Sequence, residues 1–262
     1  MREHLGNIMP SSALTSSLRD RLATLSSRRA ARPSGGLRLG LEALDGRLGA
    51  GLAADALHEV YATSTCQAAA ADGFGLALAL RTGRVPLVWV REDRSRHETG
   101  LLYGGGLHEW GLEPDDLLLV RVPDARALLA AGEEALRSGA AGAVLMSGWG
   151  EAKAFTLTAS RRLALAATEG RGAAVLVRAG ARPQPGAAET RWSVEAAPST
   201  ALEARAPGRP AFKVSLLRSR AGLAPGVWIM EWDRESRSFV EPEASGRLVS
   251  VPARRSTGVR AA

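Results

Sequence analysis

The segment Leu57–Val90 sets the architecture and reads L-H-E-V-Y-A-T-S-T-C-Q-A-A-A-A-D-G-F-G-L-A-L-A-L-R-T-G-R-V-P-L-V-W-V. Its pattern predicts a short apolar strand at Leu57–Tyr61, an alanine-rich helix over residues 66–81, and a buried strand at Pro86–Val90. A strand, a helix and a second strand in this order are typical of a parallel sheet, because parallel strands need a long crossover between them.

The same alternation continues toward the C-terminus. Strands are predicted at Leu117–Val122, Ala143–Met146 and Ala173–Arg178, with helices over residues 124–138 and 154–169. After a Pro- and Gly-rich loop at 181–190, three strands follow without helices between them, at Trp192–Ala196, Ala211–Leu217 and Val227–Trp232. We therefore expect an α/β fold with a mainly parallel central sheet, covered on both faces, and antiparallel C-terminal strands that continue the sheet.

Three segments are expected along the chain. Residues 1–36 form an N-terminal amphipathic helix, over 11–30, and a linker; residues 37–242 form the folded domain; residues 243–262 form a basic disordered tail. The helix carries an apolar stripe at helical spacing, made of Leu14, Leu18, Leu22 and Leu25. This stripe either packs on its own domain or docks on a partner subunit.

The net charge of +7 lies at the two ends of the chain. Residues 1–36 hold six arginines against two acidic residues, and residues 243–262 hold four arginines against one. Such an arginine-rich composition is typical of a GC-rich genome, and it also suits basic termini that contact DNA.

Composition excludes several classes of protein. The single cysteine, Cys66, rules out an intramolecular disulfide and a cysteine-rich zinc site. No apolar run approaches the ~20 residues of a membrane span. We expect a cytoplasmic protein without a membrane contact.

The turn after the first strand is where phosphates bind in nucleotide-binding α/β proteins, on the backbone N–H groups of a helix N-terminus. A working phosphate loop reads G-x-x-x-x-G-K-[ST], because glycines let the backbone approach and lysine balances the phosphate charge. Here the sequence is Y-A-T-S-T-C-Q-A-A-A, without glycine or lysine. We expect no catalytic residue, no metal and no nucleotide or other cofactor.

Three sequence features near this turn are expected to have structural roles only. Cys66 is expected as a small buried residue of the alanine-rich helix. The glycines Gly104–Gly106 are expected in a flexible turn before a helix near His108–Trp110, and the mixed charges of residues 91–98 in a solvated loop.

The order of segments resembles the RecA superfamily over residues 37–235. Leu37–Tyr61, which reads L-R-L-G-L-E-A-L-D-G-R-L-G-A-G-L-A-A-D-A-L-H-E-V-Y, is similar to the segment that leads into the phosphate loop of RecA-type cores. Glu92 stands where RecA carries its catalytic glutamate, and Ser147 stands at the position of the metal-binding aspartate. The resemblance implies a RecA-like core.

A later strand, V-S-L-L-R-S-R-A-G, resembles the RecA strand whose two basic residues reach the nucleotide of the adjacent protomer. Arg218 and Arg220 match those two positions. They are interpreted either as partner-binding residues or as surface cations on an exposed strand.

The departures from RecA are concentrated at the nucleotide site. The phosphate-loop glycines fall on Ala62 and Gln67, and the lysine and threonine fall on Ala68 and Ala69. The aspartate is replaced by Ser147. The two DNA-binding loops of RecA correspond to short stretches here, Gly150–Lys153 and residues 180–190. The resemblance therefore implies a retained fold with a dismantled ATPase.

One branch of the superfamily combines these features, and the chain is identified as resembling the ImuA family of the alphaproteobacterial type. The pieces that carry the resemblance are L-H-E-V-Y without a phosphate loop, G-G-L-H-E-W-G-L, R-W-S-V-E-A-A-P-S, L-L-R-S-R-A-G and W-I-M-E-W. The resemblance implies an accessory protein of damage-induced mutagenic translesion synthesis. Its implied partners are an ImuB-like inactive Y-family polymerase, RecA and an error-prone DNA polymerase.

Two other functions fit part of the same pattern. One is a cell-division inhibitor that resembles SulA, which also has a nucleotide-free RecA-like core. The other is a RecA-superfamily ATPase with an unusual nucleotide site. Binding to the division GTPase would favour the first, and stabilisation of the fold by MgATP would favour the second.

Overall fold

A computed structural model describes residues 16–22, 36–49, 51–199 and 208–242. The predicted C-terminal tail, Leu14, Leu25 and most of the predicted linker lie outside the described residues. The described strands are β1 (Leu57–Ala62), β2 (Leu87–Glu92), β3 (Leu117–Val122), β4 (Ala143–Trp149), β5 (Ala173–Ala179), β6 (Thr190–Ala196), β7 (Ala211–Ser219), β8 (Gly226–Asp233) and β9 (Ser238–Val240). The helices are α2 (Glu42–Leu48), α3 (Ala68–Arg81), α4 (Asp93–Thr99), α5 (Gly104–Glu109), α6 (Ala125–Arg137) and α7 (Leu157–Gly170), with short 3₁₀ turns η2 (Thr65–Gln67) and η3 (Pro114–Asp116).

The described strands form one sheet of nine strands in the order β3-β2-β4-β5-β1-β6-β7-β8-β9. Neighbours from β3 to β6 are parallel, and β6 to β9 are antiparallel. The predicted α/β class and the mainly parallel sheet are confirmed. One detail differs, because β6 was expected in the antiparallel set but pairs in parallel with β1. The loop of residues 180–189 is long enough to return β6 to the same end of the sheet.

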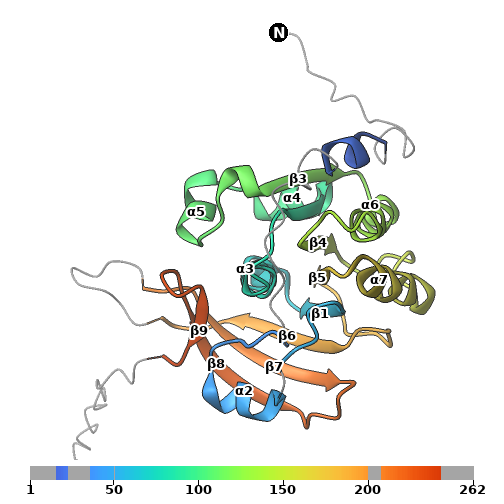
Figure 1. The fold of residues 1–262 in the computed structure, drawn as a ribbon. Coiled ribbons are helices and arrows are strands. Elements are labelled where there is room, and N and C mark those ends of the chain that lie inside the picture. The colour runs from blue at the N-terminus through green and yellow to red at the C-terminus, as the bar shows by residue number, and fades with distance from the viewer. Residues whose placement is uncertain (1–15, 23–35, 50, 200–207, 243–262) are drawn as a thin grey trace, which may run out of the picture.

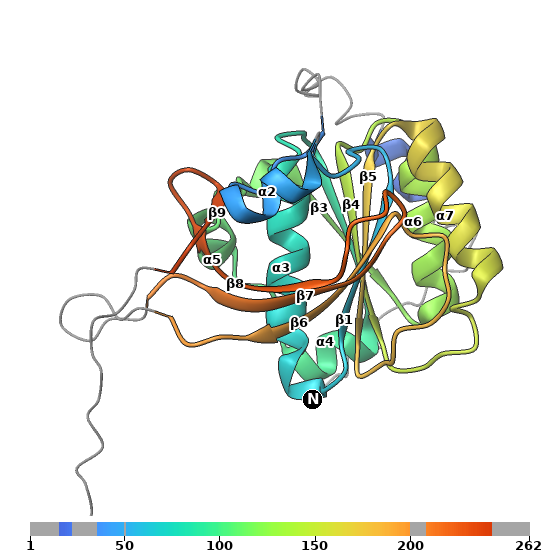
Figure 2. The same cartoon turned by 90° about the horizontal axis from the view of Figure 1, so that it is seen from below.

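Helices cover both faces of the parallel part of the sheet (Figure 1). Helix α3 lies on one face, where the sheet curves around it and an aromatic cluster fills the space, made of Phe74, Trp192, Phe212, Trp232 and Phe239. Figure 2 shows β6, β7 and β8 crossing in front of α3. A Cβ on Gly75 would lie 2.8 Å from Val177 Cγ2, so glycine lets α3 approach β5 closely.

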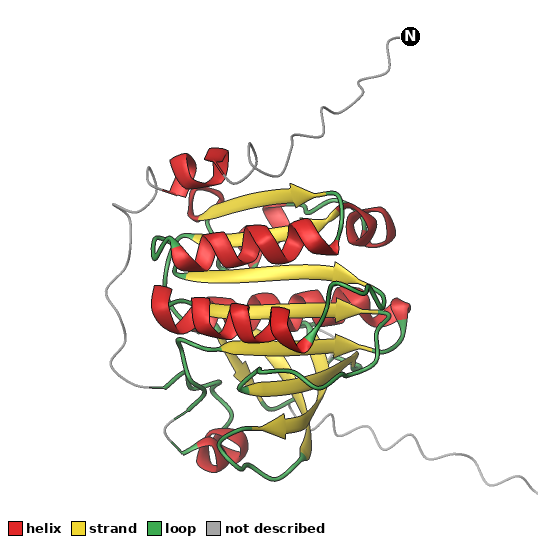
Figure 3. Cartoon of the chain, turned by 90° about the vertical axis from the view of Figure 1, so that its right-hand side faces the viewer, coloured by secondary structure: helices red, strands yellow, loops and turns green. Residues whose placement is uncertain are grey.

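Helices α6 and α7 lie side by side over the opposite face (Figure 3). Residues 16–22 are helical, as predicted, and lie beside α6. Leu18 and Leu22 are buried in the core under α6, and Arg19 forms an ion pair with Glu134. The described part of the apolar stripe therefore packs on its own domain. For Leu18 and Leu22 the partner-docking interpretation is wrong, because these side chains are already covered.

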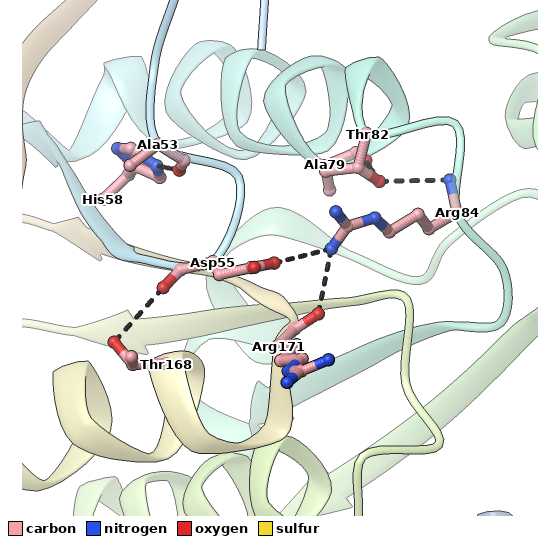
Figure 4. Close-up of polar contacts among 8 residues, drawn as sticks. All are labelled: Ala53, Asp55, His58, Ala79, Thr82, Arg84, Thr168 and Arg171. Atoms are coloured by element: carbon pink, nitrogen blue, oxygen red, sulfur yellow. Dashed lines mark hydrogen bonds and ion pairs between the residues drawn. The ribbon is translucent and has the colours of Figure 1, made fainter. Parts of the chain in front are cut away.

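A buried arginine joins the segments at the amino ends of the parallel strands (Figure 4). Arg84 Nη1 donates to Asp55 Oδ1 at 2.8 Å and to the Arg171 carbonyl at 2.9 Å. Thr82 accepts from the Arg84 N–H, and Thr168 donates to the Asp55 carbonyl. The turns that precede β1, β2 and β5 are thereby bound to one another.

Three local predictions are wrong. Residues 93–99 form α4 instead of a solvated loop, because Arg91 Nη2 donates to Thr99 Oγ1 at 2.6 Å and holds the end of the helix. The glycines Gly104–Gly106 begin α5, whose Leu107 packs against the core. Cys66 is exposed, because the chain makes the turn η2 there and the helix begins only at Ala68.

Candidate nucleotide and partner sites

The loop between β1 and α3 uses its own backbone donors. The Gln67 N–H donates to the Ser64 carbonyl at 3.1 Å, and the Ala68 N–H donates to the Thr65 carbonyl. None of residues 62–69 has a positive φ. A phosphate nest needs successive N–H groups that point outward from alternating right- and left-handed residues. These two N–H groups are instead bound within the turn.

The first turn of α3 is closed by apolar contacts. Ala68 is 2% exposed and forms a small buried cluster with Trp149, at the end of β4, and Ala179, at the end of β5. The phosphate-binding lysine of RecA matches Ala68, and an ammonium group there would be buried against an indole. Ala62 is also buried, whereas Ala69 is exposed. Gln67 is held by its side chain, whose Oε1 accepts from the Ala196 N–H at 2.7 Å.

A buried polar chain runs through Ser147, the residue that the resemblance matches to the RecA metal-binding aspartate. Ser147 accepts a hydrogen bond from Trp89 Nε1 at 2.9 Å and donates one to Asp72 Oδ1 at 2.7 Å. Asp72 lies on α3, one turn after its start, and burial raises the pKa of its carboxyl group, an effect that the Ser147 hydrogen bond and the charge of Arg91 oppose. The polar atoms face each other across the sheet and helix, and serve to join them.

Glu92, at the end of β2, is held by the neighbouring strand. Its Oε2 accepts from the Trp149 N–H at 3.1 Å. The pKa of Glu92 is raised, because burial outweighs the opposing effect of the Trp149 hydrogen bond. The structure therefore places Glu92, Ser147 and Ala68 at the same end of the sheet, as the RecA resemblance implies.

Arg218 and Arg220 lie at the other end of the sheet. The register aligns Ser219 with Thr190, and Thr190 with His58 at the start of β1. Both arginines are exposed, and Arg220 Nη1 donates to the Ala187 carbonyl at 3.3 Å. The Arg218 guanidinium makes no hydrogen bond or ion pair with the described residues. The two arginines are close to one another in sequence and far from the β1–α3 loop.

The two stretches that correspond to RecA's DNA-binding loops are short and joined by Arg178. Its Nη2 donates to the Gly150 carbonyl at 3.2 Å, and its Nη1 donates to Gln184 Oε1 at 3.4 Å. The guanidinium also lies 4.1 Å from the centre of the Phe155 ring. Arg178 is 2% exposed, so this cation is a fixed part of the carboxyl end of the sheet.

Sequence reasoning did not single out Asp72, Trp149 or Arg178. A carboxylate inside an alanine-rich helix, and a charged residue inside an apolar strand, are the signals that could have marked Asp72 and Arg178. In the described ranges, no three His, Cys, Asp or Glu side chains gather in a way that could hold a metal ion.

Comparison with proteins of known structure identifies the type of fold. No protein-family model and no curated protein sequence matches the chain. Among solved structures, the crystal structure of the RadB recombinase matches with a TM-score of 0.52 and 16% identity, over 79% of this chain and 100% of that one. The chain has a RecA-like fold.

At this level of identity the likeness is one of fold. In the part of the chain that the structure covers, no helix is long and apolar enough to span a bilayer.

Proposed function

We propose that this protein is a non-catalytic accessory factor of damage-induced mutagenic translesion DNA synthesis. It acts by contacts with RecA, an ImuB-like inactive Y-family polymerase and an error-prone polymerase. The observation that carries the proposal is the closed β1–α3 loop in a RecA-like fold: the Gln67 and Ala68 donors are bound within the turn, and Ala68 packs with Trp149. The assignment to mutagenic translesion synthesis rests on the resemblance to the ImuA family.

The positions of the two RecA-related sites support a role at a filament end. Head-to-tail assembly joins one face of a subunit to a different face of the next. Arg218 and Arg220 lie at the end of the sheet opposite Ala68 and Glu92. In this proposal the face with Arg218 and Arg220 still binds a RecA subunit, whereas the face with Ala68 holds no nucleotide. Such a subunit can add to the end of a filament and stop its growth.

The chemistry of the arginine pair suits this contact. Arginine binds phosphate oxygens through two parallel N–H donors and stays charged at every physiological pH. Arg218 is exposed and makes no ion pair with the described residues, so it is available for the nucleotide of an adjoining RecA subunit. Arg220 is already bound to the Ala187 carbonyl, which fixes its direction.

The test measures RecA filament length on single-stranded DNA with ATP, at rising concentrations of this protein. We expect the wild type to shorten filaments, and the Arg218→Ala, Arg220→Ala double variant to need at least about tenfold more protein. The matched control is Arg94→Ala with Arg161→Ala, two exposed arginines elsewhere. Equal shortening by the double variant and the wild type would remove the arginine mechanism.

A second experiment tests the pathway. The tagged protein is purified from DNA-damaged cells, and the proteins bound to it are identified. We expect an inactive Y-family-like polymerase, RecA or an error-prone polymerase. Recovery of the division GTPase without these proteins would replace the proposal with a SulA-like function, and a rise in Tm with MgATP would replace it with an unusual ATPase.

The basic termini provide a further part of the proposal. DNA affinity that depends on arginines releases counterions, so it weakens steeply with salt. We expect removal of residues 243–262 to lower DNA binding at low salt. Binding that is unchanged by the truncation would exclude the tail from DNA contact.

A further inference from the structure

An open groove lies between α6 and α7 on the face of the molecule away from α3. It encloses about 930 Å³, including its open mouth, and its apolar floor consists of Leu129, Ala130, Ala154, Ala159 and Leu163. At their C-terminal ends the two helices touch, since Gly170 lies directly against the Leu136 carbonyl. The groove therefore opens between their N-terminal halves.

The groove continues inward into a smaller recess. The recess, of about 290 Å³ with its mouth, shares Leu129, Thr156 and Ala159 with the groove and reaches Arg178 on β5. Arg178 is buried and its Nε atom has no hydrogen-bond partner among the described residues. A buried cation thus lies in the wall of the recess, whose interior has room for about 20 Å³. The groove and this recess are together called the channel below.

The residues around the channel carry more positive than negative charge. Glu133 is bound by Arg137 at 2.8 Å and Arg162 at 2.6 Å, and Glu59 in the recess is bound by Arg191 at 2.8 Å. These ion pairs satisfy the carboxylates that line the channel.

Three cations of the lining remain without a carboxylate. Within the described ranges, Arg126, Lys153 and Arg178 have none within 4.0 Å. The acids next to them in the chain are engaged elsewhere, because Asp124 caps α6 and Glu151 accepts from the Arg182 N–H. Both helices also begin here, and their N-terminal dipoles add positive potential.

We propose that this groove docks an acidic amphipathic helix of a partner protein. The apolar side of that helix covers the floor around Leu129 and Ala130, and its carboxylates pair with Arg126 and Lys153. A helix laid into a groove between two helices is a recurrent mode of recognition, and it is read through apolar anchors at helical spacing. The site is separate from Arg218 and Arg220, so this inference goes beyond RecA docking.

The lining favours a protein segment over nucleic acid. Single-stranded nucleic acid is bound by aromatic platforms on which bases stack. The lining of the groove holds leucine, alanine, threonine and charged side chains but no aromatic one, and the carboxylate of Glu133 is among the charged groups. An apolar floor with cations at the rim matches a helix that has one leucine face and one glutamate face.

The probe is a fluorescent synthetic helix of about 18 residues, with leucines at helical spacing and glutamates elsewhere. A twin peptide has lysine in place of each glutamate. Binding to the full-length protein is measured by fluorescence anisotropy at low and high salt. The groove variant is Arg126→Glu with Lys153→Glu, and the control is Arg94→Glu with Arg161→Glu, which makes the same charge change at exposed positions that do not line the groove.

We expect saturable binding of the acidic peptide, no binding of the lysine twin, and at least about tenfold weaker binding by the groove variant alone. Ala130→Phe, which fills the floor without changing charge, should weaken binding as well. Melting curves establish that each variant folds. An equal loss in the groove and control variants, or no saturable binding, overturns the proposal. Binding of a single-stranded oligonucleotide that is lost only in the groove variant reassigns the groove to nucleic acid and overturns it too.

Discussion

The Ser147 hydroxyl donates a hydrogen bond to Asp72 Oδ1 at 2.7 Å, across 75 residues of sequence. Ser147 is the residue that the RecA resemblance matches to a metal-binding aspartate, and Asp72 comes from α3, the helix that follows the β1–α3 loop. The pair joins β4 to α3 inside the protein. Its hydrogen bonds to Asp72 and Trp89 make Ser147 part of the packing between the sheet and α3.

Asp72→Asn should make stability less dependent on pH. Burial raises the pKa of Asp72, so the folded protein keeps this proton to a higher pH than the unfolded chain does. The corresponding stability is present below the unfolded pKa and is lost as pH rises through the folded pKa. Asparagine keeps the acceptor for Ser147 without the charge. We expect the variant to be more stable than the wild type at neutral pH, with the difference shrinking in acid.

Urea unfolding at a series of pH values measures this difference. Glu98→Gln, an exposed position on α4, serves as the control and should follow the wild type at every pH. Parallel pH profiles for the wild type and Asp72→Asn would contradict the assignment of Asp72 as a buried acid that titrates.

Ala68→Lys should destabilise the protein without creating a nucleotide site. Ala68 is buried with Trp149 and Ala179, so an ammonium group there loses its hydration, and we expect a cost of about 2 kcal/mol or more. Ala69→Lys is the matched control, because Ala69 is exposed, and it should change stability by less than about 0.5 kcal/mol. Melting with and without MgATP makes the measurement, and a Tm that MgATP raises in either variant would contradict a closed loop.

Asp55→Ala should destabilise the protein, because it removes the carboxylate partner of Arg84 at the amino end of the sheet. The Arg84 side chain is 3% exposed. It forms an ion pair with the Asp55 side chain, which is 41% exposed. We expect Asp55→Ala to cost about 1–3 kcal/mol in unfolding free energy, because a hydrogen bond to a buried charged group is lost. Asp55→Asn keeps the acceptor and should cost less. Chemical denaturation distinguishes the two, and an equal cost would show that the charge alone matters.

Gly170→Ala should separate α6 from α7, whereas Gly46→Ala should stabilise α2. A Cβ on Gly170 would lie 1.7 Å from the Leu136 carbonyl oxygen, a backbone atom that cannot move without shifting the helix. We expect a loss of about 1–3 kcal/mol. Gly46 has no atom within 4 Å of its added Cβ, so alanine should add about 0.5–1 kcal/mol. Unfolding curves check both, and a neutral Gly170→Ala would contradict this close contact of the helices.

Local sequence patterns were sufficient for the elements of the central sheet. Apolar runs such as Leu87–Val90 have the length and composition of buried strands, and helical periodicity marks α6 and α7. The RecA resemblance singled out Glu92 and Ser147, and the structure places the two residues near one another at the ends of neighbouring strands. Helix α4 was missed, because its charges are mixed and contacts elsewhere hold it. A helix was expected near His108–Trp110, but α5 begins earlier, at Gly104.

Amino-acid patterns alone established the α/β class, the strand–helix alternation and the absence of a phosphate-loop motif, because these depend on residues close together in the chain. Only the tertiary structure decided that Leu18 and Leu22 face the protein's own core, and that Asp72 meets Ser147. It also brought Arg126, Lys153 and Arg178 to one channel. An amphipathic stripe defines a face but not what covers it, and the partners of a buried charge depend on which strands become neighbours.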